Sequence, residues 1–301
     1  MYLKSFDDII QKLKKATSLK KVALVCAEDK EAIEASLKTK KEGILEPILI
    51  GNTCKIQKLL LERGESIEDF ENFDVENPDE AAQLGVRLVN EKKADFLMKG
   101  SLQTGQLLKA VVDKNKGLGI GRIMSHMAIQ TVPKYHKMLV TTDGGMVLYP
   151  NLEEKKAIIE NAVNALISLG YTKPKVGILA AIEKVNPKMP ETIDGAELKK
   201  MNQEGIIKNC LIEGPISFDL AINKEKALAK QYVSDVAGDA DILLTPNIAA
   251  GNILGKCLVE MSGATMAGLI LGAKVPIVVT SRGASMEEKY LSLALAGAIV
   301  L

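Results

Sequence analysis

Short apolar runs rich in β-branched residues alternate along the chain with longer segments in which apolar positions recur at helical spacing. A short, continuously apolar run is typical of a strand that is buried on both faces. We expect such strands at Val22 to Cys26, Ile48 to Ile50, Asp95 to Met98, Met138 to Thr142, Val176 to Ala181, Cys210 to Ile212, Ile242 to Thr245 and Ile277 to Thr280. We expect helices at Glu28 to Lys40, Lys55 to Glu62, Pro78 to Glu91, Gly105 to Asn115, Leu152 to Leu169, Ala196 to Gln203, Lys224 to Val236 and Asn252 to Glu260, with a final helix after the last strand. This alternation predicts an α/β architecture with mainly parallel sheets flanked by helices.

The length of the chain predicts two domains. Its 301 residues are roughly twice the length of a typical domain. A glycine-rich stretch between Lys116 and Pro133 predicts a hinge, and the strand that begins at Ile277 needs a sheet to join. We therefore expect a discontinuous first domain, 1–130 plus 273–301, and a second domain, 131–272.

Composition removes several classes of function. A net charge of +1 and the absence of Trp give no electrostatic footprint or stacking platform for nucleic acid, and no apolar run is long enough for a membrane span. The N-terminal segment, Met1 to Lys20, lacks the apolar region of an export signal, which favours a reducing cytoplasm.

The sequence contains few cysteine and histidine residues that could bind a metal ion or form a catalytic triad. The cysteines form no C-x-x-C pair and only two histidines are present, so no zinc site is predicted. His126 and His136 are candidate acids or bases, but neither has a recognisable nucleophile nearby in sequence.

Four polar loops follow predicted strands. In open parallel sheets, ligands bind beyond the carboxyl ends of the strands. The loops are Lys99 to Gly105, Thr141 to Gly145, Thr245 to Asn252 and Thr280 to Glu288. These loops are the candidate binding and catalytic segments.

The last of these loops delivers a hydroxyl, a guanidinium and a carboxylate to one strand-to-helix junction. Ser281 and Arg282 follow the strand, and Glu288 lies about one turn inside the next helix. Free N–H groups at a helix start and a planar guanidinium both suit phosphate, and the carboxylate suits proton transfer. The alternative is structural: Ser281 or Ser285 caps the helix and the acidic residues complement its dipole. Spacing alone leaves both interpretations open.

The other loops carry similar alternatives. Lys99 to Gly105 suits phosphate, yet it lacks the spacing of a G-x-x-x-x-G-K-[ST] loop and also fits a plain turn. Asp143 fits a turn in which the carboxylate satisfies local backbone donors. Asn247, Gly251 and Asn252 suit contact with a substrate or the start of a helix.

Six segments, in order, carry a resemblance to a known family. They are Lys99-Gly-Ser-Leu-Gln-Thr-Gly105, Gly121-Arg-Ile-Met-Ser-His126, Thr141-Thr-Asp-Gly-Gly145, Val185-Asn-Pro-Lys-Met-Pro190, Pro246-Asn-Ile-Ala-Ala-Gly-Asn252 and Ser281-Arg-Gly-Ala-Ser285. In these segments the chain resembles the phosphate acetyl/butyryltransferase family. The resemblance covers essentially residues 20 to 301.

The resemblance implies a two-domain fold similar to isocitrate and isopropylmalate dehydrogenases, with the active site in the interdomain cleft. It implies reversible transfer of a short-chain acyl group between coenzyme A and inorganic phosphate, with butyryl favoured and acetyl as the alternative. Coenzyme A thioester is then a substrate, no cofactor is tightly bound and no metal is required. A nicotinamide-dependent hydroxyacid dehydrogenase and a non-catalytic coenzyme A-binding subunit are the other hypotheses.

The resemblance also assigns roles to residues. Ser281 and Arg282 match the family's catalytic serine and arginine, and Glu288 falls where acetyl-transferring relatives have an aspartate, one methylene shorter. Gly144 or Gly145 stands where some relatives carry a cysteine, so no thiol nucleophile is expected. Proposed ligands of phosphate or coenzyme A are Lys99, Ser101, Thr104, Asn247, Gly251 and Asn252. A homo-oligomer is expected, with the apolar tail Ala294 to Leu301 available to a partner subunit.

Overall fold

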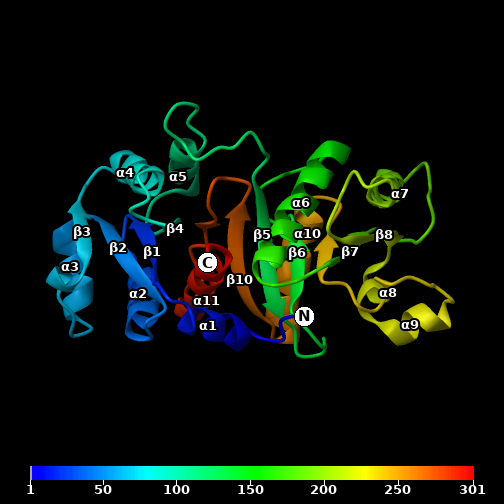
Figure 1. Cartoon of the computed structure of the whole chain (residues 1–301), viewed down its shortest axis with the longest axis horizontal. Coiled ribbons are helices and arrows are strands. Elements are labelled where there is room, and N and C mark those ends of the chain that lie inside the picture. The colour runs from blue at the N-terminus through cyan, green and yellow to red at the C-terminus, as the bar shows by residue number, and fades with distance from the viewer. Residues whose placement is uncertain (1) are drawn as a thin grey trace. The chain divides into compact units, whose positions relative to one another are not determined.

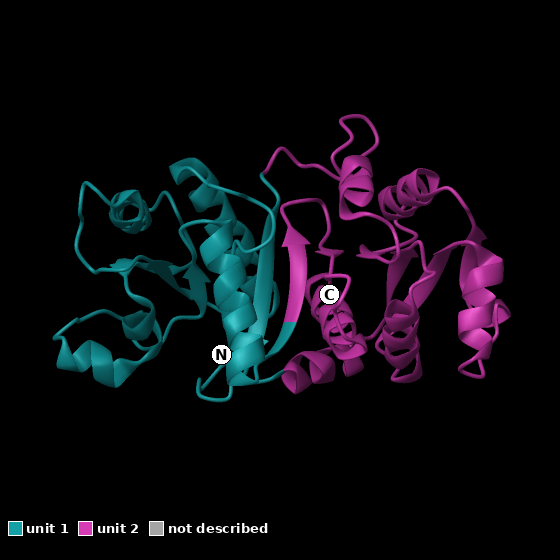
Figure 2. Ribbon diagram, turned by 180° about the vertical axis from the view of Figure 1, so that it is seen from behind, with its two compact units in different colours: residues 1–5, 123–266 teal, residues 6–122, 267–301 magenta. Residues whose placement is uncertain are grey.

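The computed structural model describes residues 2–301, and the chain divides into two compact units (Figure 2). Unit 1 is Ile123–Met266 together with the first residues up to Ser5, and unit 2 is Phe6–Arg122 together with Ala267–Leu301. The chain thus leaves unit 2 and later returns to it. The predicted domains, with boundaries at 130 and 273, stay a prediction.

Unit 2 is built on a mostly parallel sheet (Figure 1). The strand order is β3-β2-β1-β4-β11-β10, and only the pairing of β11 with β10 is antiparallel. The strands are β1 (Lys20–Val25), β2 (Leu45–Gly51), β3 (Glu71–Asp74), β4 (Phe96–Lys99), β10 (Thr265–Leu271, of which the part from Ala267 belongs to this unit) and β11 (Ile277–Val278). Consecutive residues of β4 are all buried, so both faces of the sheet are covered there.

The helices of unit 2 pack in pairs around this sheet. They are α1 (Phe6–Lys14), α2 (Lys30–Lys41), α3 (Thr53–Leu61), the short 3-10 helix η1 (Ile67–Asp69), α4 (Pro78–Asn90), α5 (Thr104–Val111) and α11 (Met286–Ile299). α4 packs on β1 and α5, while α11 packs on α2 and α1. Helix α11 is buried from Lys289 to Ala298. The expectation that the tail from Ala294 is available to a partner is therefore wrong for most of its length, because these residues fill the core of their own unit.

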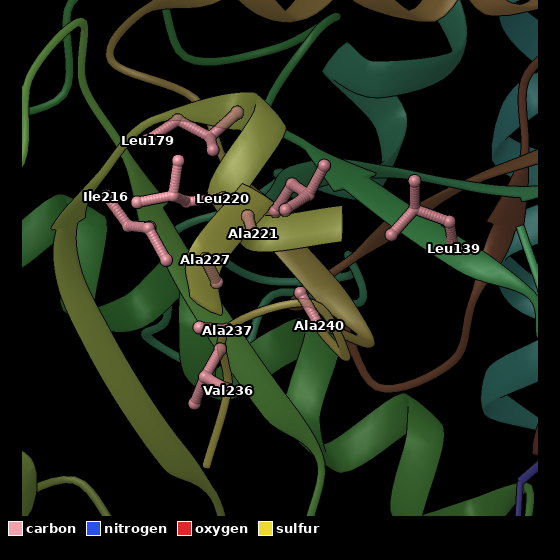
Figure 3. Packing of buried hydrophobic residues seen from close by; sticks show 10 residues of the cluster. Leu139, Leu179, Ile216, Leu220, Ala221, Ala227, Val236, Ala237 and Ala240 are labelled. Carbon is pink, nitrogen blue, oxygen red and sulfur yellow. The ribbon is translucent and has the colours of Figure 1, made fainter. Parts of the chain in front are cut away.

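Unit 1 is also built on mostly parallel strands, which follow the order β5-β6-β9-β7-β8 (Figure 1). Its strands are β5 (Ser125–Thr131), β6 (Leu139–Thr142), β7 (Lys175–Leu179), β8 (Leu211–Ile216) and β9 (Ile242–Leu244), and only β5 with β6 is antiparallel. Its helices are α6 (Leu152–Ser168), α7 (Pro190–Gln203), α8 (Phe218–Ile222), α9 (Lys224–Ala229) and α10 (Ile248–Ser262). A buried cluster that includes Leu139, Ile216, Leu220 and Leu243 packs α8 and α9 against the sheet (Figure 3).

The predicted α/β architecture with mainly parallel sheets is confirmed, with corrections to single elements. The pattern missed α1, α8, β3, β5 and β10. Helix α9 ends at Ala229 instead of Val236, and α10 begins at Ile248 instead of Asn252. No helix among residues 2–301 is both long and apolar enough to span a membrane.

Candidate active site

In unit 2, the candidate residues gather where β1, β4 and β11 end and where α2, α5 and α11 begin. Ser281 and Arg282 lie in the turn between β11 and α11, and both are exposed. Lys99 is the last residue of β4, and Thr104 is the first residue of α5. The parallel pairing of β4 with both β1 and β11 brings these strand ends to the same edge of the sheet.

Two backbone segments form a tightly packed floor at this edge. Cys26 adopts a positive φ of 53°, and its carbonyl accepts a hydrogen bond from Ser101 N at 2.8 Å. Gly100 lies so close that a Cβ there would meet Cys26 O at 2.0 Å. Only glycine lets the two segments approach in this way. Burial raises the pKa of the Cys26 thiol to about 12, with the nearby Glu28 carboxylate acting in the same direction.

Lys99 bonds its own loop. Its ammonium donates to Gly100 O at 3.1 Å and Leu102 O at 3.0 Å, and the side chain is buried. Burial lowers the pKa of Lys99, while the Asp29 carboxylate opposes that shift. The positive charges of Lys289 and Arg282 lie close enough to lower it further. Three cations therefore share this edge of the sheet.

Arg282 is held by a neutral acceptor. Its Nη2 donates to the side-chain oxygen of Gln103 at 2.7 Å, and no carboxylate within residues 2–301 forms an ion pair with it. By contrast, Arg63 bonds Glu34 at 2.7 Å. Within the described residues, the positive charge of Arg282 therefore has no paired counter-charge.

The start of α11 combines a cap, a carboxylate and a buried ion pair. Ser285 accepts a hydrogen bond from Glu288 N at 3.1 Å, which confirms the capping role considered for it. Burial raises the pKa of Glu288, and the neighbouring Lys289 opposes this effect. Lys289 in turn bonds Asp29, the cap of α2, at 2.6 Å. A half-buried carboxyl with a raised pKa holds its proton to higher pH than an exposed glutamate does.

The two remaining candidates in the loop from Lys99 to Gly105 are less buried than Lys99. Ser101 is exposed and Thr104 is half-buried. Thr104 begins α5, and the first N–H groups of a helix are in general able to bind an anion.

In unit 1, Asp143 organises the loop after β6. Its carboxylate accepts from the N–H groups of His126 at 3.0 Å, Gly145 at 2.7 Å, Met146 at 2.8 Å and Val147 at 3.2 Å. The side chain is buried. The prediction that Asp143 satisfies local backbone donors is confirmed.

The other unit 1 candidates pack against this loop. Asn247 caps α10 by accepting from Ala250 N at 3.0 Å, and Asn252 donates to Gly144 O at 3.1 Å. A Cβ on Gly251 would meet Asp143 O at 2.4 Å. Asn247 thus starts the helix, and Gly251 provides a close backbone contact.

His126 lies against Gly145, the second residue after Asp143. A Cβ on Gly145 would meet its ring at 3.0 Å, and its Nδ1 is buried without a partner within residues 2–301. Burial lowers the pKa of His126, while the Asp143 carboxylate opposes this shift. Among the described residues, no group of three or more His, Cys, Asp or Glu side chains has an arrangement that could hold a metal ion.

Comparison with known proteins places this chain in a family. The sequence pattern of the Phosphate acetyl/butaryl transferase family matches residues 64–297. The chain belongs to this family. It is 40% identical over 297 residues to the phosphate butyryltransferase of Clostridium acetobutylicum, covering 99% of this chain and 98% of the relative. It is 41% identical over 278 residues to the phosphate acetyltransferase of Thermotoga maritima, covering 92% of this chain and 94% of that protein.

A solved structure agrees with this assignment. The chain is similar to a branched-chain phosphotransacylase from Enterococcus faecalis, with 32% sequence identity and a TM-score of 0.83 over 94% of this chain and 99% of that one. The α/β fold with mainly parallel strands is therefore that of a phosphotransacylase.

The sequence did not single out Gln103, Asp29 or Lys289 as neighbours of the candidate residues. The signal for Gln103 is its residue type: it stands at the N-cap of α5, where the shorter Ser, Thr, Asp and Asn are preferred and glutamine is unusual. For the pair of Asp29 with Lys289 no signal existed, because the two residues are 260 positions apart.

Proposed function

We propose that the chain catalyses reversible transfer of a short-chain acyl group, with butyryl preferred, between coenzyme A and inorganic phosphate. The observation that carries the proposal concerns Arg282 in this member of the family. Its guanidinium is exposed at a strand-end loop and has no carboxylate partner among residues 2–301. Such a group attracts a phosphate dianion.

In the proposed reaction, a phosphate oxygen attacks the thioester carbonyl carbon. A carbon–oxygen bond forms, the carbon–sulfur bond breaks, and coenzyme A leaves as a thiolate. Arg282 holds the phosphate and stabilises negative charge on the carbonyl oxygen, while the Ser281 hydroxyl donates to the departing sulfur. Both substrates bind together, so orientation is supplied without an acyl-enzyme.

Glu288 acts as the general base and general acid in this proposal. In acyl-CoA synthesis it removes the thiol proton, and in the other direction it returns this proton to the thiolate, as microscopic reversibility requires. The raised pKa of Glu288 supports this role, since it brings the carboxyl closer to neutral pH than an exposed glutamate.

The loops at the other strand ends supply the proposed binding groups. Ser101 and Thr104 are proposed to contact phosphate or pyrophosphate oxygens, and Asn247, Gly251 and Asn252 to contact coenzyme A. The expected interdomain cleft, the dehydrogenase-like topology and the homo-oligomer rest on the family resemblance and stay predictions. No tightly bound cofactor is proposed, since acyl transfer moves no electrons between substrates.

The acyl group is the least constrained part of the proposal. One methylene changes binding by only ~1 to 3 kcal/mol, so neighbouring chain lengths compete. Acetyl is the second candidate, because the Thermotoga maritima relative named phosphate acetyltransferase is 41% identical.

The test is a panel of acyl-CoAs of increasing chain length, assayed for coenzyme A release with and without phosphate. We expect phosphate-dependent release with an optimum at butyryl-CoA. Arg282→Ala should lower kcat by about 100- to 1,000-fold, as loss of an oxyanion donor does. Arg87→Ala is the control, because Arg87 is exposed and only loosely paired with Glu91 at 4.0 Å. Full activity of folded Arg282→Ala would refute the site, and release that ignores phosphate would refute the reaction.

A further inference from the structure

Gln103 stands at the start of α5, and its side chain reaches the neighbouring loop. It is the N-cap residue of α5, yet its backbone N–H is bonded by Gln106 Oε1 at 3.2 Å. A short polar side chain at an N-cap normally bonds the helix start, whereas the longer carboxamide of Gln103 reaches Arg282 at 2.7 Å. The side chain thus serves the neighbouring loop.

The backbone around Gln103 is held from both sides. On the N-terminal side, the buried Lys99 ammonium bonds Leu102 O at 3.0 Å. On the other side, Gln106 also donates to Asp79 of α4 at 3.1 Å. Residue 103 is therefore fixed by two elements before its side chain meets the guanidinium.

We propose that Gln103 is a positioning residue for Arg282, and that Lys99 acts by holding the loop that carries Gln103. This inference rests on the proposed phosphate acyltransfer. A neutral carboxamide orients the guanidinium without cancelling its charge, so the remaining N–H donors stay available to phosphate. Arg63 shows the opposite case in the same unit, since Glu34 and Glu62 both pair with it.

The distinction between orientation and charge gives a specific test. In Gln103→Glu, a carboxylate pairs with Arg282 and competes with phosphate, so the KM for phosphate should rise about tenfold or more while the KM for acyl-CoA stays unchanged. In Gln103→Met, the charge remains but the acceptor is lost, so kcat should fall about three- to tenfold with little change in the phosphate KM. A purely structural role predicts equal losses of stability and no such split.

Gln57→Met is the matched control. Gln57 lies on α3 in the same unit, and its Oε1 accepts from Ile67 N at 2.9 Å. Its loss removes a comparable hydrogen bond outside the strand-end loops. Unfolding midpoints of all three variants identify any that fail to fold.

A second measurement does not depend on acyl transfer. Phenylglyoxal labels arginine, and labelling of Arg282 is followed by mass spectrometry at increasing inorganic phosphate. We expect phosphate to protect the wild type and Gln103→Met, and Gln103→Glu to require about tenfold more phosphate. Equal protection curves for wild type and Gln103→Glu, or no protection of the wild type, would overturn the inference. If the wild type releases no coenzyme A from any acyl-CoA, the proposed function fails, while the labelling still decides the role of Gln103.

Discussion

The ion pair between Lys289 and Asp29 predicts which substitutions at these two positions destabilise the protein most. The Lys289 side chain is only 3% exposed, whereas that of Asp29 is 20% exposed, and their Nζ and Oδ1 atoms are 2.6 Å apart. Asp29 Oδ1 also accepts from Ala32 N at 2.8 Å as the cap of α2. Removing Asp29 therefore leaves a buried ammonium without a counter-charge, whereas removing Lys289 leaves a partly exposed carboxylate that still bonds Ala32 N.

Asp29→Ala should be the most damaging substitution. It leaves a buried ammonium without its counter-charge, which costs ~3 to 5 kcal/mol, and removes a helix cap worth ~1 kcal/mol. Because Asp29 is partly exposed, we take the lower end and expect a loss of about 4 kcal/mol in the free energy of unfolding. Asp29→Asn keeps the cap and should lose about 1 kcal/mol less. Lys289→Met leaves a carboxylate that water and Ala32 N still reach, so we expect a loss of about 1 to 2 kcal/mol.

Urea unfolding followed by circular dichroism measures this order, with Glu287→Gln as the control. Glu287 is also on α11, but its pair with Lys38 is exposed at 3.2 Å, so we expect a change within about 0.5 kcal/mol. A loss from Lys289→Met that equals or exceeds the loss from Asp29→Ala would refute the reasoning.

Three further substitutions test single features of the site. Glu288→Gln should abolish acyl-CoA synthesis. Because burial raises the native pKa of Glu288, the wild type loses stability as the pH rises from about 4.3 through that pKa. The variant should therefore gain stability relative to the wild type over this interval, which a pH series of urea midpoints measures. Gly100→Ala should lower the melting temperature and kcat together, because its Cβ would lie 2.0 Å from Cys26 O, and normal activity in a thermally stable variant would contradict this packing. Asp143→Asn should destabilise unit 1 by about 2 kcal/mol, since either amide orientation aims an NH2 group at two backbone donors, and unchanged unfolding by urea would count against this role.

The hydrophobic pattern missed β5, in which buried polar residues flank the apolar positions. Strand β5 contains Ser125 and Gln130, both buried. Asn161 donates to Ser125 Oγ at 2.9 Å, and Gln130 donates to Gly255 O at 3.3 Å. These partners lie far away in sequence, and the apolar run of the strand is limited to Met127, Ala128 and Ile129.

The missed helix α1 has a different cause. It has only nine residues, and its buried positions, Phe6, Ile9 and Leu13, are separated by charged residues. Its stability comes from packing on α11, at the other end of the chain. A local pattern does not contain that contact.

For the candidate site, the sequence identified the loops but not the directions of their side chains. Strand ends of a parallel sheet indicate where polar loops collect. Whether Lys99 points to a ligand or to its own loop depends on the fold of that loop, and the structure directs it to Leu102 O. The contact between Gln103 and Arg282 spans 179 positions and depends on the pairing of β4 with β11.

The burial of α11 has a consequence for attempts to change substrate preference. Glu288 stands on the first turn of α11, and the later part of this helix, from Leu293 to Ala298, is fully buried. A Cβ on Gly297 would meet Leu45 Cδ2 at 2.7 Å, so the far end of this helix has little freedom to shift. Libraries that vary the interior of α11 should therefore mostly yield misfolded chains, whereas variation in the exposed loops leaves the scaffold under the proposed base undisturbed.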